Sequence, residues 1–325
     1  METDSPTTSP AQEEQRNRRH TVRMIVFAVL AALFVMLAAL RLLGIDGNRY
    51  TAALIALTPY WTAGGLVLGV LALAMRHWWI GVGVVAVSVA LTAALLPRLV
   101  PATEPAASGK QLRIMSSNLY LGQADAKSVV QLVRDHGVDV LNMLELTPSE
   151  VAEFERAGLF DLLPYRVLEP DSGGAGSGIA SRYPLTKLSL TVPSLLAQPS
   201  ARVDLGGISV EVVAIHPIPP VTSASVWAKE MAELPGPGDS VRILAGDFNA
   251  TLDHAAFRRL LARGYADAGE RRGSGFVPTW PSDSFPPPVT IDHVVVDPRV
   301  AVNDYQVLDV PGSDHRAVYA RLTLP

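Results

Sequence analysis

Residues 241–249 read Val-Arg-Ile-Leu-Ala-Gly-Asp-Phe-Asn, an apolar run that stops at polar side chains. We expect a strand over 241–245, because near-continuous apolar strands are typical of a sheet covered on both faces. Gly246 permits a sharp bend, after which Asp247 and Asn249 flank an inward-facing aromatic residue. The stretch therefore predicts a buried strand whose end carries polar groups. The alternative is an Asx-turn that leads into a helix with Asp253 as its N-cap.

Two later strings follow the same pattern, Ile291-Asp292-His293 and Ser313-Asp314-His315. Asp292 lies in an apolar strand expected over 289–296, where a carboxylate needs a partner that offsets its burial. Asp314 and His315 directly precede a strand expected over 316–324. For this last pair, a simple cap of the strand is the alternative.

Three earlier strand ends also carry polar side chains, namely Asn118, Glu145 and His216. Each of them alone has a structural alternative: Asn118 can start a turn, Glu145 can be a solvated strand end, and His216 can hydrogen-bond a loop. Polar groups at one edge of a covered sheet can, however, converge on one site. We therefore expect these residues and the three later strings to form one polar cluster.

Strands and helices alternate after residue 111. Further strands are expected over 112–116, 138–144, 178–181 and 208–215, and helices over 126–136, 223–234 and from Asp253 through 263. The pattern predicts a layered α/β domain with mixed strand directions. No Gly-rich dinucleotide-binding pattern and no P-loop pattern is found.

The composition excludes several kinds of site. The chain has no cysteine, so disulfides, thiolate zinc sites and a cysteine nucleophile are excluded. Residues 1–100 carry a net charge of +3 and residues 101–325 a net charge of −7. An acidic region is a poor match to tight, non-specific binding of duplex DNA, which depends on cationic side chains.

The first hundred residues predict a membrane region. Residues 1–23 are polar and are expected to be a disordered cytoplasmic tail. Three apolar runs follow over 24–43, 51–75 and 78–96, separated by short polar breaks. They predict three transmembrane helices within residues 24–100, although Pro59 makes the second run the weakest span. The Pro-rich residues 101–110 are expected to be a linker to a catalytic domain over 111–325.

Basic residues predict the orientation of this region. Arg16, Arg18, Arg19 and Arg23 precede the first run, which favours a cytoplasmic N-terminus. Three spans then put residues 101–325 on the extracytoplasmic side of the cell membrane, whereas two spans would leave them in the cytoplasm. The runs hold Ser, Thr and a terminal Arg41 as their polar residues, so they favour an anchor over a transporter.

The polar strings together suit metal-assisted phosphoester hydrolysis, and they resemble the endonuclease/exonuclease/phosphatase superfamily, which has the pancreatic-deoxyribonuclease fold. The resemblance covers residues 111–325 in the order of the family. It rests on Asn118, Glu145, Ser177-Gly-Ile-Ala-Ser-Arg-Tyr-Pro184, His216, Gly246-Asp-Phe-Asn249, Thr279-Trp-Pro281, Ile291-Asp-His293 and Ser313-Asp-His315. It implies a four-layer α/β sandwich with two central mixed sheets.

The resemblance also implies roles for the site residues. Glu145 would hold a divalent cation, Mg²⁺ or Mn²⁺, with Asn118 nearby and Asp314 as a second metal-associated carboxylate. Asp247 would orient or deprotonate the attacking water. His315, oriented by Asp292, would act as a base or stabilise the phosphate. His216 and Asn249 would bind phosphate oxygens, and His216 is also a candidate acid for the leaving group. His293 is expected to be structural, and Arg182 to form a salt bridge or lie near the phosphate.

The implied function is a membrane-anchored, metal-dependent hydrolase that cuts a phosphate ester by in-line attack of water. Its substrate could be a nucleic acid, a lipid head group or a small molecule, and its other partner is the lipid bilayer; no protein partner is implied. The alternative is a non-catalytic, membrane-tethered binding module on the same fold. That alternative is disfavoured, because every expected position carries a suitable residue.

Overall fold

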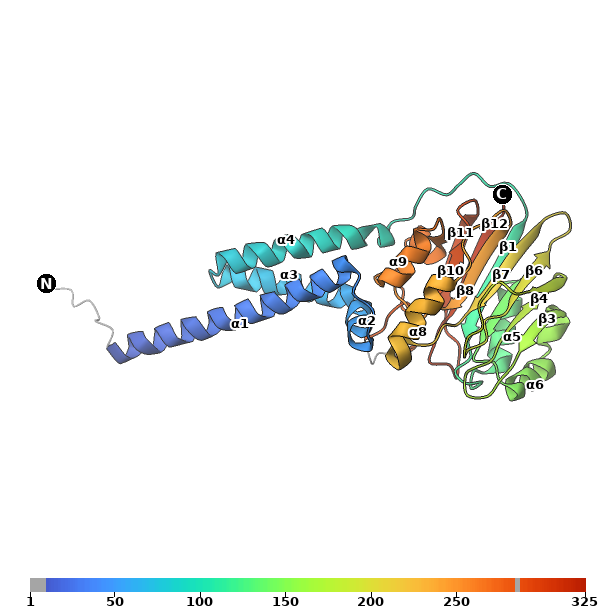
Figure 1. Cartoon of the computed structure of the whole chain (residues 1–325), viewed down its shortest axis with the longest axis horizontal. Helices are drawn as coiled ribbons and strands as arrows, with labels where there is room; N and C mark the ends of the chain where they lie inside the picture. Colours follow the sequence, from blue (N-terminus) through green and yellow to red (C-terminus); the bar gives the residue numbers. More distant parts are fainter. Residues whose placement is uncertain (1–9, 284–286) are drawn as a thin grey trace. The chain divides into compact units, whose positions relative to one another are not determined.

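The computed structural model describes residues 10–283 and 287–325 and divides the chain into two compact units. One unit contains helices α1 (Pro10–Leu43), α3 (Thr58–Ala74) and α4 (Trp78–Leu95) (Figure 1). The other contains Gly44–Leu57 and Leu95–Pro325. The loop after the first helix is therefore part of the same unit as the predicted catalytic domain. We refer to the first unit as the helical unit and to the second as the catalytic unit.

The helical unit has its own apolar core, to which Phe34, Ala38, Val84 and Leu91 contribute. Two helices are long and apolar enough to cross a membrane, over Ala11–Leu43 and Trp78–Leu99. Residues 10–23, expected as part of a disordered tail, are helical and begin α1. Residues 1–9 of that expected tail lie outside the described residues.

The second apolar run is broken into two helices. Helix α2 (Arg49–Ala56) ends before α3, and the two are bent by 67° and form a third span only if counted together. Pro59 has no N–H to donate to the carbonyl of Ile55, so the helix cannot continue unbroken. The structure thus assigns the first part of this run to the catalytic unit rather than to the helical one.

The catalytic unit contains two six-stranded mixed sheets. The first has the order β11-β12-β1-β2-β4-β3, with bounds Ala301–Leu308, Ala317–Thr323, Gln111–Asn118, Val140–Leu144, Ser177–Ser181 and Tyr165–Glu169. The second has the order β5-β6-β7-β8-β10-β9, with bounds Leu185–Leu188, Ser200–Asp204, Ser209–Ile215, Val241–Asp247, Asp292–Val296 and Ala266–Asp267. Each sheet has one parallel pair, β1 with β2 and β7 with β8, and its other pairs are antiparallel.

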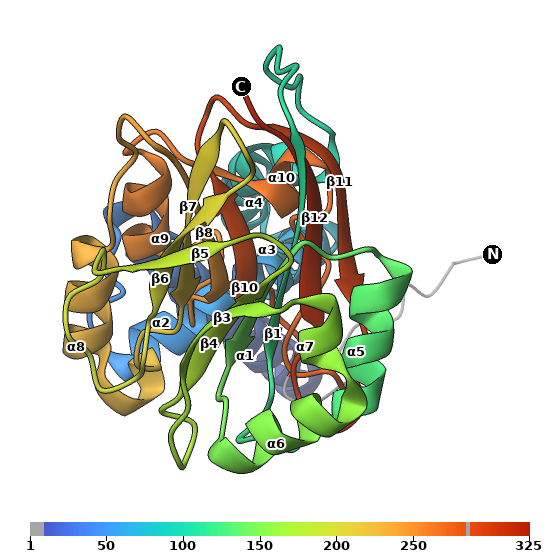
Figure 2. The same ribbon diagram turned by 90° about the vertical axis from the view of Figure 1, so that its right-hand side faces the viewer.

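Three apolar cores separate four layers, which confirms the expected α/β sandwich (Figure 2). One core lies between the sheets. A second lies under α5 (Ala126–Asp135), α6 (Pro148–Ala157) and α7 (Leu159–Leu162), and a third under α8 (Pro220–Glu233) and α9 (Ala255–Leu261). The short helices η1 (Leu96–Leu99) and α10 (Ala268–Arg271) complete the unit.

Buried Asn142 on β2 joins the two sheets. Its amide nitrogen donates to the carbonyl oxygens of Val213 on β7, at 3.1 Å, and Ala245 on β8, at 2.8 Å. Backbone groups of one sheet are thus bonded to a side chain of the other, inside an otherwise apolar interface. We infer that Asn142 fixes how the sheets align, since a buried amide without these partners would be costly.

The segment that follows α4 is fixed by polar contacts within the catalytic unit. Arg98, in η1, makes a bidentate, buried ion pair with Asp253, with N···O distances of 2.7 and 2.9 Å. Asp253 is therefore not the N-cap expected from the sequence; His254 precedes α9, and its side chain makes no cap hydrogen bond. The expected linker has no helix or strand, but Glu104 in it accepts from the backbone of Val302 at 2.8 Å.

Gly246 on β8 lies directly beside the backbone of Ile215 on β7. A Cβ atom at this position would lie 2.0 Å from the carbonyl oxygen of Ile215, its partner in the parallel register. Backbone atoms of a central strand cannot move aside without breaking the ladder. Gly246 is thus required by packing; it lies inside β8 rather than at the bend expected from the sequence.

We predict that Gly246→Ala lowers the free energy of unfolding by about 3 kcal/mol or more, because the added methyl overpacks a central strand pair. Thermal unfolding of the detergent-solubilised chain, followed by tryptophan fluorescence, measures the change. Gly238→Ala is the matched control, since its Cβ would meet only the Arg242 guanidinium at 4.0 Å. Equal melting temperatures for the two variants would contradict this account.

Candidate active site at one edge of the two sheets

The predicted site residues lie at one edge of the sandwich because of the strand directions. The parallel strands β1 and β2 end at Asn118 and just before Glu145, and β7 and β8 end just before His216 and at Asp247. Strand β10, antiparallel to β8, begins at the same edge with Asp292, whose register partner is Asp247. His315 precedes β12, which is antiparallel to β1. Both sheets therefore deliver polar side chains to a common place.

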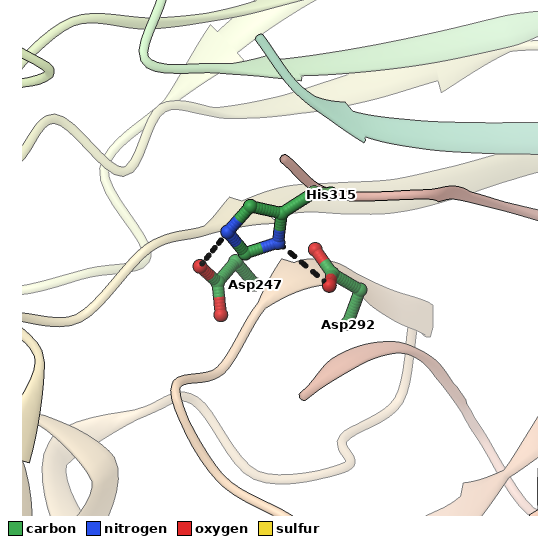
Figure 3. A group of neighbouring side chains, drawn as sticks. All are labelled: Asp247, Asp292 and His315. Atoms are coloured by element: carbon green, nitrogen blue, oxygen red, sulfur yellow. Dashed lines mark hydrogen bonds and ion pairs between the residues drawn. The ribbon is translucent and has the colours of Figure 1, made fainter. Parts of the chain in front are cut away.

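Asp247, Asp292 and His315 form the centre of this cluster (Figure 3). The Nδ1 atom of His315 lies 2.9 Å from an Asp292 carboxylate oxygen, and its Nε2 atom lies 3.8 Å from Asp247. All three residues are buried, and one ligand atom from each lies within 4.8 Å of the others. The imidazole thus stands between two carboxylates, one of which fixes its orientation.

His315 is held in its protonated form. Burial lowers the pKa of its imidazole, but the charge of Asp292 and the hydrogen bond to it outweigh burial and raise the pKa to about 10. An imidazolium is a poor base and a good partner for an anion. This favours phosphate stabilisation over the base role among the two roles implied for His315.

Asp247 is a candidate base by its environment. Burial, and then the nearby charge of Asp292, raise the pKa of its carboxyl group to about 7. A general base works best when its pKa lies near the working pH. The backbone N–H of Asn249 donates to Asp247 Oδ1 at 2.8 Å, whereas Oδ2 is the oxygen nearer to His315.

Glu145 and Asn118 form one hydrogen-bonded unit. The amide nitrogen of Asn118 lies 3.1 Å from Glu145 and 3.3 Å from Asp247, and its amide oxygen accepts from the backbone N–H of Tyr120 at 3.0 Å. Glu145 has a φ of 56°, a left-handed backbone that is uncommon for this residue, and it accepts from Leu121 N–H at 2.7 Å. In this arrangement Asn118 orients both carboxylates.

Asp314 presents one carboxylate oxygen to the site. The indole N–H of Trp280 donates to its Oδ2 atom at 3.0 Å. Its Oδ1 atom is buried, has no hydrogen-bond partner among the described residues, and lies 4.0 Å from His315 Nε2. A buried carboxylate oxygen without a donor is a suitable position for a cation to bind.

His216 and Asn249 lie on the side of β7 and β8. His216 Nε2 lies 3.9 Å from Glu145, and its Nδ1 atom has no hydrogen-bond partner among the described residues. Burial, and then the positive charge of His315, lower the pKa of His216 to about 4. A neutral imidazole can donate one hydrogen bond to a phosphate oxygen. Asn249, with a φ of 50°, is held by a 3.1 Å hydrogen bond to the carbonyl of Pro217.

His293 and Arg182 lie outside this cluster. His293 is bound on both ring nitrogens, to Asp267 and to the carbonyl of Ala250, both at 2.9 Å. Both contacts tie the ring to neighbouring buried groups and leave neither ring nitrogen for the site. Arg182 is half exposed and lies 3.6 Å from Asp139, so the expected salt bridge is found.

Three contacts that position the site carried no role in the sequence analysis. Thr279 Oγ accepts from the backbone N–H groups of Ile291 and Asp292, at 3.0 and 3.1 Å. Ser313 Oγ donates to the carbonyl of Asn118 at 2.8 Å and so connects β1 to the loop before β12. Trp280 holds Asp314. Thr279 and Trp280 belong to the Thr279-Trp-Pro281 string and Ser313 directly precedes Asp314. The sequence therefore indicated these positions but not the groups that they contact.

Comparison with known proteins supports this fold. Residues 115–315 match the model described as the Endonuclease/Exonuclease/phosphatase family. Three similar solved structures each cover 66% of this chain. Humanized D. rerio TDP2 with 14 mutations has 18% identity and a TM-score of 0.55, and D. rerio TDP2 complexed with a single strand DNA product has 19% identity and a TM-score of 0.54; 99% of each of these chains is covered. An endonuclease/exonuclease/phosphatase from Beutenbergia cavernae has 19% identity and a TM-score of 0.52, with 72% of its chain covered. At these identities the likeness shows the fold. The search of curated proteins gave no match.

The buried pair of His293 and Asp267 predicts a pH-dependent stability. Burial lowers the pKa of His293, but the charge and hydrogen bond of Asp267 outweigh it, so the net pKa is raised above 6.5. The pair stabilises the fold fully below about pH 6.5, and this contribution is lost as the pH rises through the raised folded-state pKa. We predict that Asp267→Asn, which keeps a side-chain oxygen for the cap of α10, costs about 3 kcal/mol at pH 5.5 and less at pH 9.

Thermal unfolding of the wild type and the variant in detergent at both pH values measures this difference. The same loss of stability at pH 5.5 and pH 9 would show that His293 is not held as a cation.

Proposed function

The chain belongs to the Endonuclease/Exonuclease/phosphatase family, whose members hydrolyse phosphoester bonds, and we propose that it is a membrane-anchored, divalent-metal-dependent phosphoesterase. The observation that carries the proposal is the arrangement of Asp247, His315 and Asp292. They form a buried row of carboxylate, imidazole and carboxylate, of which Asp247 and His315 line an open cavity. Around it stand the side chains that an in-line attack of water requires.

The oxygen-rich side of the site fits a hard divalent cation, which we propose to be Mg²⁺ or Mn²⁺. Glu145 and Asp314 would hold it, with Asn118 nearby orienting Glu145. The buried, unpartnered Oδ1 atom of Asp314 and the convergence of several carboxylates on one place support this fit. When bound, the cation supplies a Lewis acid that polarises the phosphoryl oxygen and neutralises the charge that develops on it.

The protein groups divide the remaining chemistry among them. Asp247 accepts a proton from the attacking water, whose oxygen forms the new bond to phosphorus. The protonated His315, fixed by Asp292, and the amide of Asn249 stabilise the charge on the phosphate oxygens. The P–O bond opposite the water breaks, and the leaving alkoxide takes up a proton from solvent water; a hydrogen bond from the neutral His216 would stabilise this alkoxide.

We predict that Asp247→Asn and His315→Gln each lower kcat/KM by at least about a hundredfold, because each removes a group that acts in the transition state. The measurement is hydrolysis of bis-(p-nitrophenyl) phosphate by the detergent-solubilised chain with Mg²⁺ or Mn²⁺. Removal of the metal with a chelator is expected to abolish the activity. Asp161→Asn, at an exposed position on α7, is the matched control and is expected to leave kcat/KM unchanged.

Full activity in both site variants would overturn this assignment of residues. Failure of the wild type on diesters, monoesters, DNA and lipids alike would favour a non-catalytic binding module on the same fold.

We further propose that the catalytic unit is extracytoplasmic. Helix α1 would cross the membrane with Arg16, Arg18, Arg19 and Arg23 on the cytoplasmic side. Gly44–Leu57, directly after α1, belongs to the same compact unit as Leu95–Pro325, and a folded unit lies on one side of a bilayer. The catalytic residues would then lie opposite the N-terminus, and α3 and α4 would both cross or both turn back. The catalytic unit would lie on this side whether or not α3 and α4 cross the membrane.

The absence of native cysteine makes the topology directly measurable. We predict that single thiols introduced by Gly47→Cys and Leu195→Cys react with a membrane-impermeant maleimide in intact cells, because both sites are exposed parts of the catalytic unit. Glu14→Cys is expected to react only after permeabilisation. Labelling of positions 47 and 195 from opposite sides would refute the shared location, and labelling of position 14 alone in intact cells would invert the topology.

A further inference from the structure

A cavity of about 510 Å³ opens beside the catalytic side chains, and its lining combines polar site residues with many apolar residues. At one end lie the polar groups of the site, including Glu145, Asp247 and His315. The remaining lining is mostly apolar and includes Ala53, Ala56, Leu57, Pro220, Val221 and Ile291. A ligand that fills the cavity therefore needs a charged head and an apolar tail.

Part of the apolar wall comes from α2, the short helix between α1 and α3. Helix α2 packs against α8 within the catalytic unit (Figure 1). Ala53, Ala56 and Leu57 come from this segment, and Pro220 and Val221 come from the start of α8. The loop after the first apolar helix thus completes the cavity, and residues 95–325 alone would leave one side of it open.

Two buried polar contacts fix this segment to the catalytic unit. A backbone N–H of Thr251 donates to His254 Nδ1 at 2.9 Å, so the other ring nitrogen carries the proton and donates to the carbonyl of Ala52 at 3.0 Å. Asp46, which is also buried, accepts from the backbone N–H of Ala256 at 3.0 Å. The wall formed by α2 is therefore a fixed part of the cavity.

The charge of the cavity disfavours a nucleic acid as its occupant. Among the described residues that line it there is no Lys or Arg, whereas three are acidic: Glu145, Asp247 and Asp314. Binding of a polynucleotide depends on cations along its backbone. A single phosphate group attached to an alkyl chain needs only the few polar groups that this site provides.

The covalent connections of α2 point to the source of such a ligand. Leu57, in the apolar wall, is bonded to Thr58, the first residue of the apolar helix α3. Gly44, at the other end of the segment, follows the last residue of α1. If α1 crosses the bilayer, the wall of the cavity lies within a short length of chain from the lipid.

We propose that the substrate is an amphiphilic phosphate ester from the lipid bilayer, whose alkyl or acyl chain packs against the wall formed by α2 and the start of α8. This inference rests on the proposed phosphoesterase function and specifies its substrate class. Hydrolysis occurs at the phosphorus: the water oxygen bonds to it, the ester P–O bond breaks, and the alcohol leaves with a proton. The apolar tail takes no part in the chemistry and positions the head.

The test compares ethyl and octyl 4-nitrophenyl phosphate diesters as substrates of the full chain in detergent with Mg²⁺. Each buried CH₂ group can raise kcat/KM by up to about fourfold, so we expect the octyl ester to be preferred by about tenfold or more. Leu57→Asp and Val221→Asp place a charge on the apolar wall and are expected to bring the octyl-to-ethyl ratio close to one. Leu195→Asp, an exposed leucine outside this wall, is expected to keep the ratio of the wild type.

A ratio close to one in the wild type would overturn the proposal, and so would a ratio that both wall variants preserve. Val221 is 58% exposed, so its variant remains informative if Leu57→Asp does not fold. If neither ester is hydrolysed, the proposed phosphoesterase function is wrong. The preference of the cavity for an apolar chain is then tested by ligand binding instead. Calorimetry is then expected to give at least about tenfold tighter binding of octylphosphonate than of ethylphosphonate, with the difference lost in Val221→Asp; equal affinities would overturn it.

Discussion

The buried pair of Asp292 and His315 is the interaction on which the site depends. Asp292 begins a strand of one sheet, and His315 precedes a strand of the other, so their 2.9 Å contact joins the two sheets at the edge where the polar residues meet. Removing one partner of such a buried pair leaves an uncompensated charge, which costs about 3–5 kcal/mol. Asn142 makes a second connection between the sheets deeper in the sandwich. Together these contacts fix the position of Asp247 and of the side chains that surround it.

The sequence predicted β4 and the central strands β1, β2, β7, β8, β10 and β12, because the central strands are nearly continuous apolar runs with polar residues at one end. It missed β3, β5, β6 and β11, whose exposed and buried residues mix, and it missed α6. The residues of the site were found because they end or begin central strands. The contacts of Ser313 and Asn142 could not be found, since each joins segments far apart in the chain, and those of Thr279 depend on a loop whose path the sequence does not reveal. Asp253 was interpreted as a cap for the same reason: its partner, Arg98, lies 155 residues away.

Helix α2 changes the interpretation of the membrane region. Its sequence is continuous with an apolar run, so hydropathy alone assigned it to a membrane span. The buried Asp46 and the hydrogen bond from His254 to Ala52 hold the segment in the catalytic unit instead. One short helix thus follows α1 and precedes α3 in the chain, and it also lines the active-site cavity. If α1 crosses a membrane as proposed, this arrangement gives a physical reason for the proposed preference for substrates with an apolar chain.

The central claim is that water attacks phosphorus at the cluster of Asp247, His315 and Asp292. The most direct measurement is hydrolysis of a phosphate diester by the full chain in ¹⁸O-labelled water, with mass spectrometry of both products. The account predicts one ¹⁸O atom in the phosphate product, none in the released alcohol, and loss of the reaction in Asp247→Asn. Label in the alcohol, or unchanged incorporation in that variant, would contradict it.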